Sequence, residues 1–223
     1  MEMEKDMNTV KESPKLLGMF TSPGLQFERI KQNPRIWVPL IIISILYFAG
    51  SLLMANSIDE SIFNGQELPK DQVEIILTFT KVVAVVMGAL SPGITILISS
   101  AILLIIAKMA NSAVSFKQLF SMNTYIAIIA AVGLIINMAV RFIIGGKPEI
   151  YITSLAGFLN LDKAGVLSSV EVFGIWGVIL TALGLHKTAQ FSKGLAWTIA
   201  IAFFLIGMGF GLVGTLFQGA PKL

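Results

Sequence analysis

The chain has 223 residues, of which 55% are hydrophobic and only 13% charged, and its formal net charge is +3. A water-soluble domain carries about a quarter charged residues, so this composition excludes most soluble folds and indicates an integral membrane protein. The absence of cysteine excludes disulfides, thiolate metal sites and a cysteine nucleophile, and the small, dispersed charge argues against nucleic-acid binding.

The first predicted element is a short amphipathic helix inside a cytoplasmic N-terminal segment, residues 1–35. Pro23 suits the first turn of a helix, and Pro34 ends it because proline disfavours a helical residue before it. Leu25, Phe27 and Ile30 form its apolar side and alternate with the polar side chains Gln26, Glu28, Arg29 and Lys31. The pattern predicts a helix held against the inner leaflet, and it leaves open whether the helix is only an orientation signal or also a contact surface.

Five apolar blocks follow, and they predict an all-α, polytopic membrane protein with a five-transmembrane-helix bundle. A helix crosses a bilayer in about 20 residues, and only helices satisfy the backbone of such uninterrupted apolar runs in lipid. The fourth block supports the prediction of five spans least, because its apolar centre is short and it reaches spanning length only when it is extended at both ends. The spans are predicted at about 36–56, 82–107, 124–140, 167–189 and 195–217 within a membrane domain of residues 36–217, before a tail, 218–223.

The distribution of lysine and arginine orients these spans. With the N-terminus inside, ten of the 16 basic residues lie in inner segments and six in outer ones, which agrees with the positive-inside rule. Trp37 lies at headgroup depth, and Pro39 lies in the first turn of the first span, where proline is tolerated. We expect a multi-pass protein of a bacterial cytoplasmic membrane with the N-terminus inside and the C-terminus outside.

Two predicted outer loops contain local order. Pro69 and Asp71 indicate that the second helix begins well before the membrane, near Lys70. Residues 145–171 place apolar side chains close to a 3.6-residue period, which fits an interfacial helix; an ordered loop packed on the helix ends fits equally well.

Several features inside the spans carry alternative interpretations. Pro92-Gly93 interrupts the second span, either as an ordinary packing kink or as a hinge or binding kink. Asn137 is read as a clasp between helices rather than as a ligand for a substrate. Gly207, Gly211 and Gly214 form a small-residue face on the last span, and a complementary face around Trp176 on the fourth span favours packing within the chain.

Three stretches together resemble bacterial members of the Yip (Ypt-interacting protein) membrane family. They are SPGLQFERIKQNPRIWVPLI, the inner-loop stretch SAVSFKQLFSMNTYIAIIAAVGLII and EVFGIWGVILTALGLHKTAQFSKGLAWTIA, in that order along the chain. The resemblance implies a membrane protein that binds other membrane proteins. Among bacterial members it implies a partner in an ABC-type exporter complex, either its subunits or its adaptor, that serves resistance to a toxin or antimicrobial peptide.

The residues favour a non-enzymatic scaffold or accessory protein. No paired aspartates, serine–histidine pair or zinc motif lies within the spans, and His186 beside Lys187 at a span end is read as an interfacial residue. We therefore expect no catalytic, cofactor or metal site, and as partners the lipid bilayer, other membrane proteins and, as a further alternative, a second copy of the chain. A small-solute channel or permease is the alternative function. The predicted interaction residues are Pro23, Phe27, Ile30, Pro34, Trp37, Pro39, Phe116, Lys117, Trp176, Gly207, Gly211 and Gly214.

Overall fold

The computed structural model describes residues 12–63, 68–147, 149–161 and 165–219, and for 211–219 it describes the backbone only. The prediction of an all-α fold is confirmed, since the described residues form helices joined by loops and one isolated β-bridge, Ser154 with Glu171. The helices are α1 (Gly18–Thr21), α2 (Pro23–Gln32), α3 (Trp37–Asn56), α4 (Lys70–Met109), α5 (Phe116–Ile144), α6 (Leu155–Phe158), α7 (Val166–Ser169), α8 (Val172–Lys187) and α9 (Lys193–Gly219), with a 3-10 turn η1 (Glu60–Phe63).

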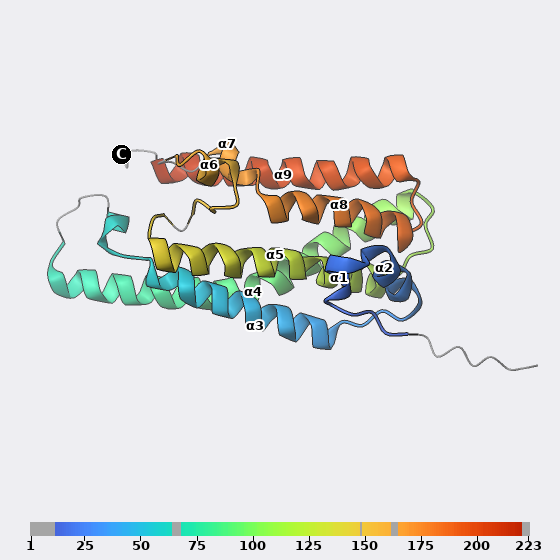
Figure 1. Ribbon diagram of the computed structural model, residues 1–223, viewed down its shortest axis with the longest axis horizontal. Coiled ribbons are helices and arrows are strands. Elements are labelled where there is room, and N and C mark those ends of the chain that lie inside the picture. Colours follow the sequence, from blue (N-terminus) through green and yellow to red (C-terminus); the bar gives the residue numbers. More distant parts are fainter. Residues whose placement is uncertain (1–11, 64–67, 148, 162–164, 220–223) are drawn as a thin grey trace, which may run out of the picture.

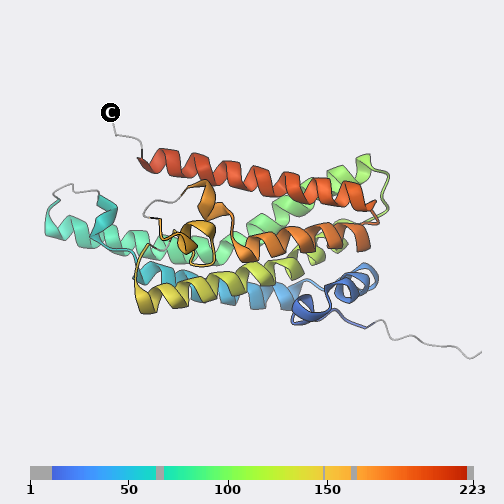
Figure 2. The same cartoon turned by 45° about the horizontal axis from the view of Figure 1, so that its top comes forward.

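Five helices lie along the long axis of the molecule, α3, α4, α5, α8 and α9 (Figures 1 and 2). Helices α1 and α2 lie at one end of this bundle, which we call the α2 end, whereas α6 and α7 lie toward the other, the α6 end (Figure 1). The chain enters the bundle at the α2 end, and α9 finishes at the α6 end, so the first and last long helices begin and finish at opposite ends.

Four of these helices are long and apolar enough to cross a membrane: α3, α4, α5 and the stretch Lys193–Phe210 of α9. Helix α8 has 16 residues, which at 1.5 Å per residue cover about 24 Å of a hydrocarbon core of about 30 Å. The structure therefore shows a polytopic membrane protein with a shorter fifth apolar helix. That α8 also crosses the membrane stays a prediction.

Two helix boundaries differ from the sequence prediction. Helix α5 begins at Phe116 rather than near residue 124, because Ser115 and Gln118 form a reciprocal capping box. The predicted inner loop is therefore shorter, and Phe116 and Lys117 belong to the first turn of a helix. Helix α8 begins at Val172 and does not extend back to residue 167, since the side chain of Glu171 caps it.

The described residues of the segment between α5 and α8 form a loop and not a continuous interfacial helix. It contains two single-turn helices, α6 and α7, and its side chains Ile150 and Ala156 are buried. The loop backbone pairs with itself, from Leu155 N to Val170 O (2.9 Å) and from Val172 N to Thr153 O (3.2 Å). The apolar residues that suggested an interfacial helix thus anchor a loop on the bundle.

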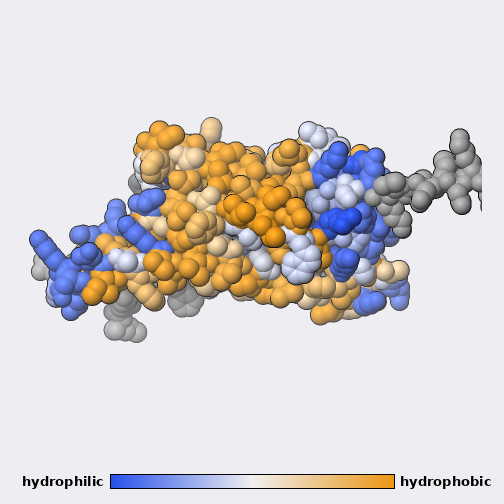
Figure 3. Space-filling model, turned by 90° about the horizontal axis from the view of Figure 1, so that it is seen from below, coloured by the Kyte–Doolittle hydropathy of each residue, from blue (hydrophilic) through white to orange (hydrophobic). Residues whose placement is uncertain are grey.

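The surface is divided by polarity along the long axis. Hydrophobic residues cover the middle of the bundle, and hydrophilic ones gather at its two ends (Figure 3). Large apolar side chains of the long helices are exposed, including Ile45, Phe79 and Ile105, which are 60–68% accessible. Such a belt matches contact with lipid hydrocarbon, where apolar side chains cost nothing to expose.

Candidate functional site

The N-terminal segment is packed into the α2 end of the bundle. Phe27 and Ile30, the apolar face of α2, are 0% exposed, as is Met19 of α1. Helix α2 contacts α5 and α8, and α1 contacts α5. The expectation that this amphipathic face lies on the inner leaflet is therefore corrected, because protein side chains and not lipid cover it.

Side chains of the bundle also hold the backbone of this segment. Polar groups of α5 and the α8–α9 connection donate to carbonyls before α1, within α2, at the C-terminus of α2 and in the loop after it. The carbonyls of Lys31 and Arg35, at that C-terminus and in that loop, lack intrahelical donors. The bonds run from Gln118 Nε2 to Lys31 O (2.7 Å), from Ser121 Oγ to Arg35 O (2.7 Å), from Thr188 Oγ1 to Phe27 O (3.2 Å) and from Tyr125 Oη to Pro14 O (3.0 Å).

Gln26 organises the turn between α1 and α2 from inside. Its side chain is 2% exposed, its Oε1 accepts a hydrogen bond from Lys15 N (2.8 Å), and its Nε2 donates to Ser22 Oγ (3.3 Å). A β-carbon on Gly18 would lie 2.4 Å from Gln26 Nε2, so only glycine allows this approach. Sequence analysis placed Gln26 on the polar face and missed this role.

Helix α8 contacts the N-terminal segment at Trp176 and at Gly184. The Trp176 ring meets Phe20 edge to face, with ring centroids 5.5 Å apart and planes at 88°. A β-carbon on Gly184 would lie 2.9 Å from Met122 Sδ and 3.0 Å from Phe27 Cε1. Trp176 thus contacts the docked N-terminal segment, a contact that sequence analysis did not predict.

Truncating Phe27 tests how much this docking contributes to stability. The Phe27→Ala variant is expected to lose about 3–5 kcal/mol of unfolding free energy, because a fully buried ring is replaced by a cavity. Leu25→Ala on the same helix is the control, since Leu25 is 47% exposed and leaves no cavity. Equal denaturation midpoints for the two variants in mild detergent would contradict the docked position of α2.

Other residues of the α2 end remain accessible on its surface. Trp37 is 76% exposed, as its predicted position at headgroup depth requires, and Leu17 and Leu25 are 79% and 47% exposed. Phe116 is 37% exposed, and Lys117 beside it is also exposed. Of the prolines, Pro23 and Pro34 are half-buried and Pro39 is buried.

The glycine face of α9 is only partly described. A β-carbon on Gly207 would meet nothing within 4 Å, and the same holds for Gly177 on α8. Helix α9 packs on α8 through buried residues such as Ala196 and Ala200 instead. The predicted close approach of the α8 and α9 glycine faces is therefore not observed at Gly207, while the surroundings of Gly211 and Gly214 lie outside the described residues.

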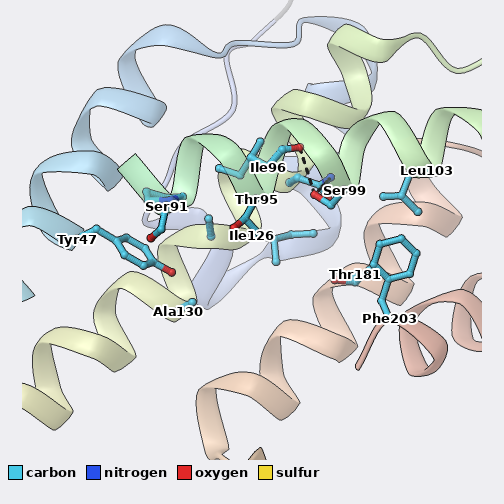
Figure 4. A pocket seen from close by; sticks show the side chains of 13 residues that line it. Tyr47, Ser91, Thr95, Ile96, Ser99, Leu103, Ile126, Ala130, Thr181 and Phe203 are labelled. Atoms are coloured by element: carbon cyan, nitrogen blue, oxygen red, sulfur yellow. Dashed lines mark hydrogen bonds between the residues drawn. The ribbon is translucent and has the colours of Figure 1, made fainter. Parts of the chain in front are cut away.

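A cavity of about 260 Å³ lies within the bundle, beside the proline of α4 (Figure 4). Its walls come from all five long helices. The lining residues are Tyr47 of α3; Ser91, Pro92, Thr95, Ile96, Ser99 and Leu103 of α4; Asn123, Ile126, Ala127 and Ala130 of α5; Thr181 of α8; and Phe203 of α9.

The interruption of α4 is repaired locally. Pro92 has no N–H to donate to Gly88 O, and Ser91 Oγ donates to that carbonyl instead, over 2.9 Å. About two turns further along, Asn123 Nδ2 donates to Ser99 Oγ (3.2 Å) and Ser100 Oγ (2.9 Å) and so ties α5 to α4. The proline therefore leaves its helix continuous and opens space on one side of it.

A second cluster of polar side chains, near the α6 end, holds the α5–α8 loop on α5. Asn137, 0% exposed, donates from Nδ2 to Thr153 Oγ1 (2.7 Å), and its Oδ1 accepts from Thr153 N (3.1 Å). Thr153 Oγ1 also lies 2.5 Å from Glu171 Oε1, while Glu171 Oε2 accepts from Gly174 N (2.7 Å) and caps α8. Asn137 is thus a clasp, as predicted, but it fastens a loop rather than a second helix.

Comparisons with known proteins agree along almost the whole chain. The family model of the Yip1 domain matches residues 17–215. Membrane protein YknW of Bacillus subtilis (strain 168) is 35% identical over 224 residues, which cover 97% of this chain and 95% of the relative. No solved structure matches.

Proposed function

Because this chain belongs to the Yip1 domain family, we propose that it is a non-enzymatic membrane scaffold that supports the assembly or activity of an ABC-type exporter. The exporter would remove a toxin or antimicrobial peptide from the cell. This family is not known as one of enzymes. The exporter as partner rests on the resemblance of residues 22–41, 112–136 and 171–200 to bacterial Yip proteins.

The observation that supports a scaffold best is the built surface of the α2 end. The buried faces of α1 and α2 fix the segment on the bundle, so its remaining apolar side chains are held in place before a partner arrives. Leu17 and Leu25 are exposed there, and the basic side chains Lys31 and Lys117 are exposed at the same end. A preorganised surface binds more tightly than a flexible one because less conformational entropy is lost on association.

The packing at the α2 end argues against the channel or permease. Between the cavity and this end, the described core includes the fully or almost fully buried apolar side chains Leu103, Leu119, Met122 and Phe27. The hydroxyls of Ser121 and Thr124, which are also buried, donate to backbone carbonyls. No continuous polar path runs through these described residues. A solute could permeate only if these packed side chains moved apart.

Affinity capture of the tagged protein from mild-detergent membranes tests the scaffold, with copurifying proteins identified by mass spectrometry. We expect exporter subunits in near-stoichiometric amount. In the Leu17→Ser/Leu25→Ser variant we expect about tenfold less of them, because two exposed contact residues worth about 1 kcal/mol or more are lost.

The control for this capture is Ile62→Ser, which removes a 41%-exposed apolar side chain at the other end of the molecule. It should retain the partner at the native level. If the native protein were recovered alone, under conditions that keep known complexes intact, the scaffold would be contradicted, and solute flux in liposomes would be the next measurement.

We further propose that the α2 end is cytoplasmic and that α8 crosses the membrane. The chain has no cysteine, so single cysteines can be labelled without background. In intact cells a membrane-impermeant maleimide should label Glu149→Cys and leave Ala113→Cys and Lys193→Cys unmodified until the cells are permeabilised. Labelling of Lys193→Cys in intact cells would show that α8 does not cross.

A further inference from the structure

The cavity beside Pro92 lies at the middle of the bundle along its long axis. Tyr47 is near the centre of α3, and Ala130 is the central residue of α5. These helices are long enough to cross a membrane, so their centres lie at the depth of the hydrocarbon. Charged lipid headgroups stay at the interface, so the depth of the cavity excludes them as its natural occupant.

Hydrogen-bonding groups face this cavity without a protein partner. Among the described residues, no hydrogen bond is formed by the Tyr47 hydroxyl, the Thr95 hydroxyl or Asn123 Oδ1. No buried side-chain nitrogen or oxygen lacks a partner in the described part of the chain, so the unpaired groups of Tyr47 and Asn123 are accessible, and Thr95 is an exposed residue. All three residues line the cavity. Tyr47, Ser91 and Thr95 gather at one side of it, and Thr181 and Phe203 lie at the other (Figure 4).

The other polar side chains of the lining are Ser91, Ser99 and Thr181, whose hydroxyls donate to backbone carbonyls of their own helices. Ile96, Leu103, Ile126 and Phe203 contribute hydrocarbon, and none of the described residues that line the cavity is Asp, Glu, Lys, Arg or His. The volume of about 260 Å³ exceeds the ~150 Å³ of an engineered apolar cavity that binds benzene. Water would leave most of this apolar wall without favourable contacts, whereas a charged molecule would have no countercharge. The lining matches a neutral molecule that is mostly hydrocarbon.

A route from the lipid to the cavity follows from the packing of the helices. Helix α4 packs on α3 and α5, whereas α9 packs on α8 and α7, and α4 and α9 scarcely touch each other. Both contribute to the lining, α4 with six residues and α9 with Phe203. We therefore expect a molecule dissolved in the lipid to reach the cavity between these two helices.

We propose that this cavity is a binding site for a neutral, membrane-dissolved molecule that carries a hydroxyl or carbonyl group, such as a long-chain alcohol. The hydroxyls of Tyr47 and Thr95 hydrogen-bond the polar group, and the hydrocarbon lies along Ile96, Leu103 and Phe203. The proposal does not depend on the scaffold function, because it rests on the cavity alone.

Photolabelling of the purified protein in liposomes with a diazirine-bearing hexadecanol tests this site. We expect saturable labelling of peptides from α4 and α5 that line the cavity, and competition by unlabelled 1-decanol but not by decanoate at pH 8. Stronger competition by decanoate than by 1-decanol would contradict the proposal that the ligand is neutral. Labelling that does not saturate and spreads over the lipid-facing helices would overturn the site.

The hydroxyl groups are tested by the double variant Tyr47→Phe/Thr95→Val, which removes both and almost preserves side-chain volume. Saturable labelling should fall at least fivefold, whereas Thr78→Val, a matched loss of a hydroxyl from an exposed position of α4 outside the cavity, should label like the native protein. If the double variant does not fold, Ala130→Phe fills the cavity from α5 and should abolish saturable labelling. Native labelling in either variant would contradict the proposal.

Discussion

Replacement of Gly184 with valine is expected to displace α2 from the bundle and to lower the unfolding free energy by about 1–3 kcal/mol. The new β-carbon alone would lie within about 3 Å of Met122 and Phe27, both of which are fully buried and have no free space to move into. Overpacking of a dense core forces side chains off their rotamers and shifts backbone. The measurement is thermal unfolding in mild detergent, combined with limited proteolysis of residues 12–35.

Gly177→Val is the matched control for this experiment. Gly177 is two turns from Gly184 on the same helix and the same face, but a β-carbon there meets nothing within 4 Å. Both variants change helix propensity equally, so any difference between them reports the contact with α2. Equal proteolysis of the N-terminal segment in the two variants would show that α2 does not pack on α8.

Removal of the Glu171 side chain is expected to release the α5–α8 loop at a cost of about 2–3 kcal/mol. Loss of the N-cap costs about 1 kcal/mol, and the Gly174 N–H and the Thr153 hydroxyl lose an acceptor in a largely buried place. In Glu171→Ala we expect much faster hydrogen exchange of the amides of Leu155 and Val172. These amides donate across the loop to Val170 O and Thr153 O, respectively.

The Glu149→Ala variant controls for loss of a carboxylate from the same loop. Glu149 is exposed, whereas Glu171 is 9% exposed, so removal of Glu149 should leave the exchange rates of the loop unchanged. Unchanged exchange in Glu171→Ala would mean that the hydrogen bonds of this carboxylate do not hold the loop.

The sequence predicts the membrane helices well because their signal is local. Uninterrupted apolar runs can only be helical in lipid, and the start of α4 at Lys70 follows from Pro69 and Asp71 before it. The fourth helix was harder to delimit. Its apolar centre is short and can be extended at either end, and the side chain of Glu171, which acts as an N-cap, determines where α8 begins.

The docked N-terminal segment depends on long-range contacts that no local pattern contains. The apolar face of Phe27 and Ile30 predicts burial, but lipid and protein satisfy this pattern equally well. Gly184 is the one hint, since a glycine within an apolar helix often marks a close approach; its partners lie on α2 and α5, far away in sequence. The cavity likewise requires five helices to converge, and Pro92 alone indicates only an interruption.

Cross-linking of α2 to α8 in native membranes tests most directly whether the N-terminal segment is part of the bundle. Lys187 Nζ lies 2.7 Å from Glu28 Oε1, so cysteines at these two positions of the cysteine-free chain are within reach of a short bismaleimide. After protease cleavage between them, we predict that the two fragments of Glu28→Cys/Lys187→Cys remain linked. The pair Glu60→Cys/Lys187→Cys, with its first residue in η1, should yield separate fragments. Separate fragments for both pairs would contradict the docked segment and, with it, the preorganised surface on which the proposed scaffold depends.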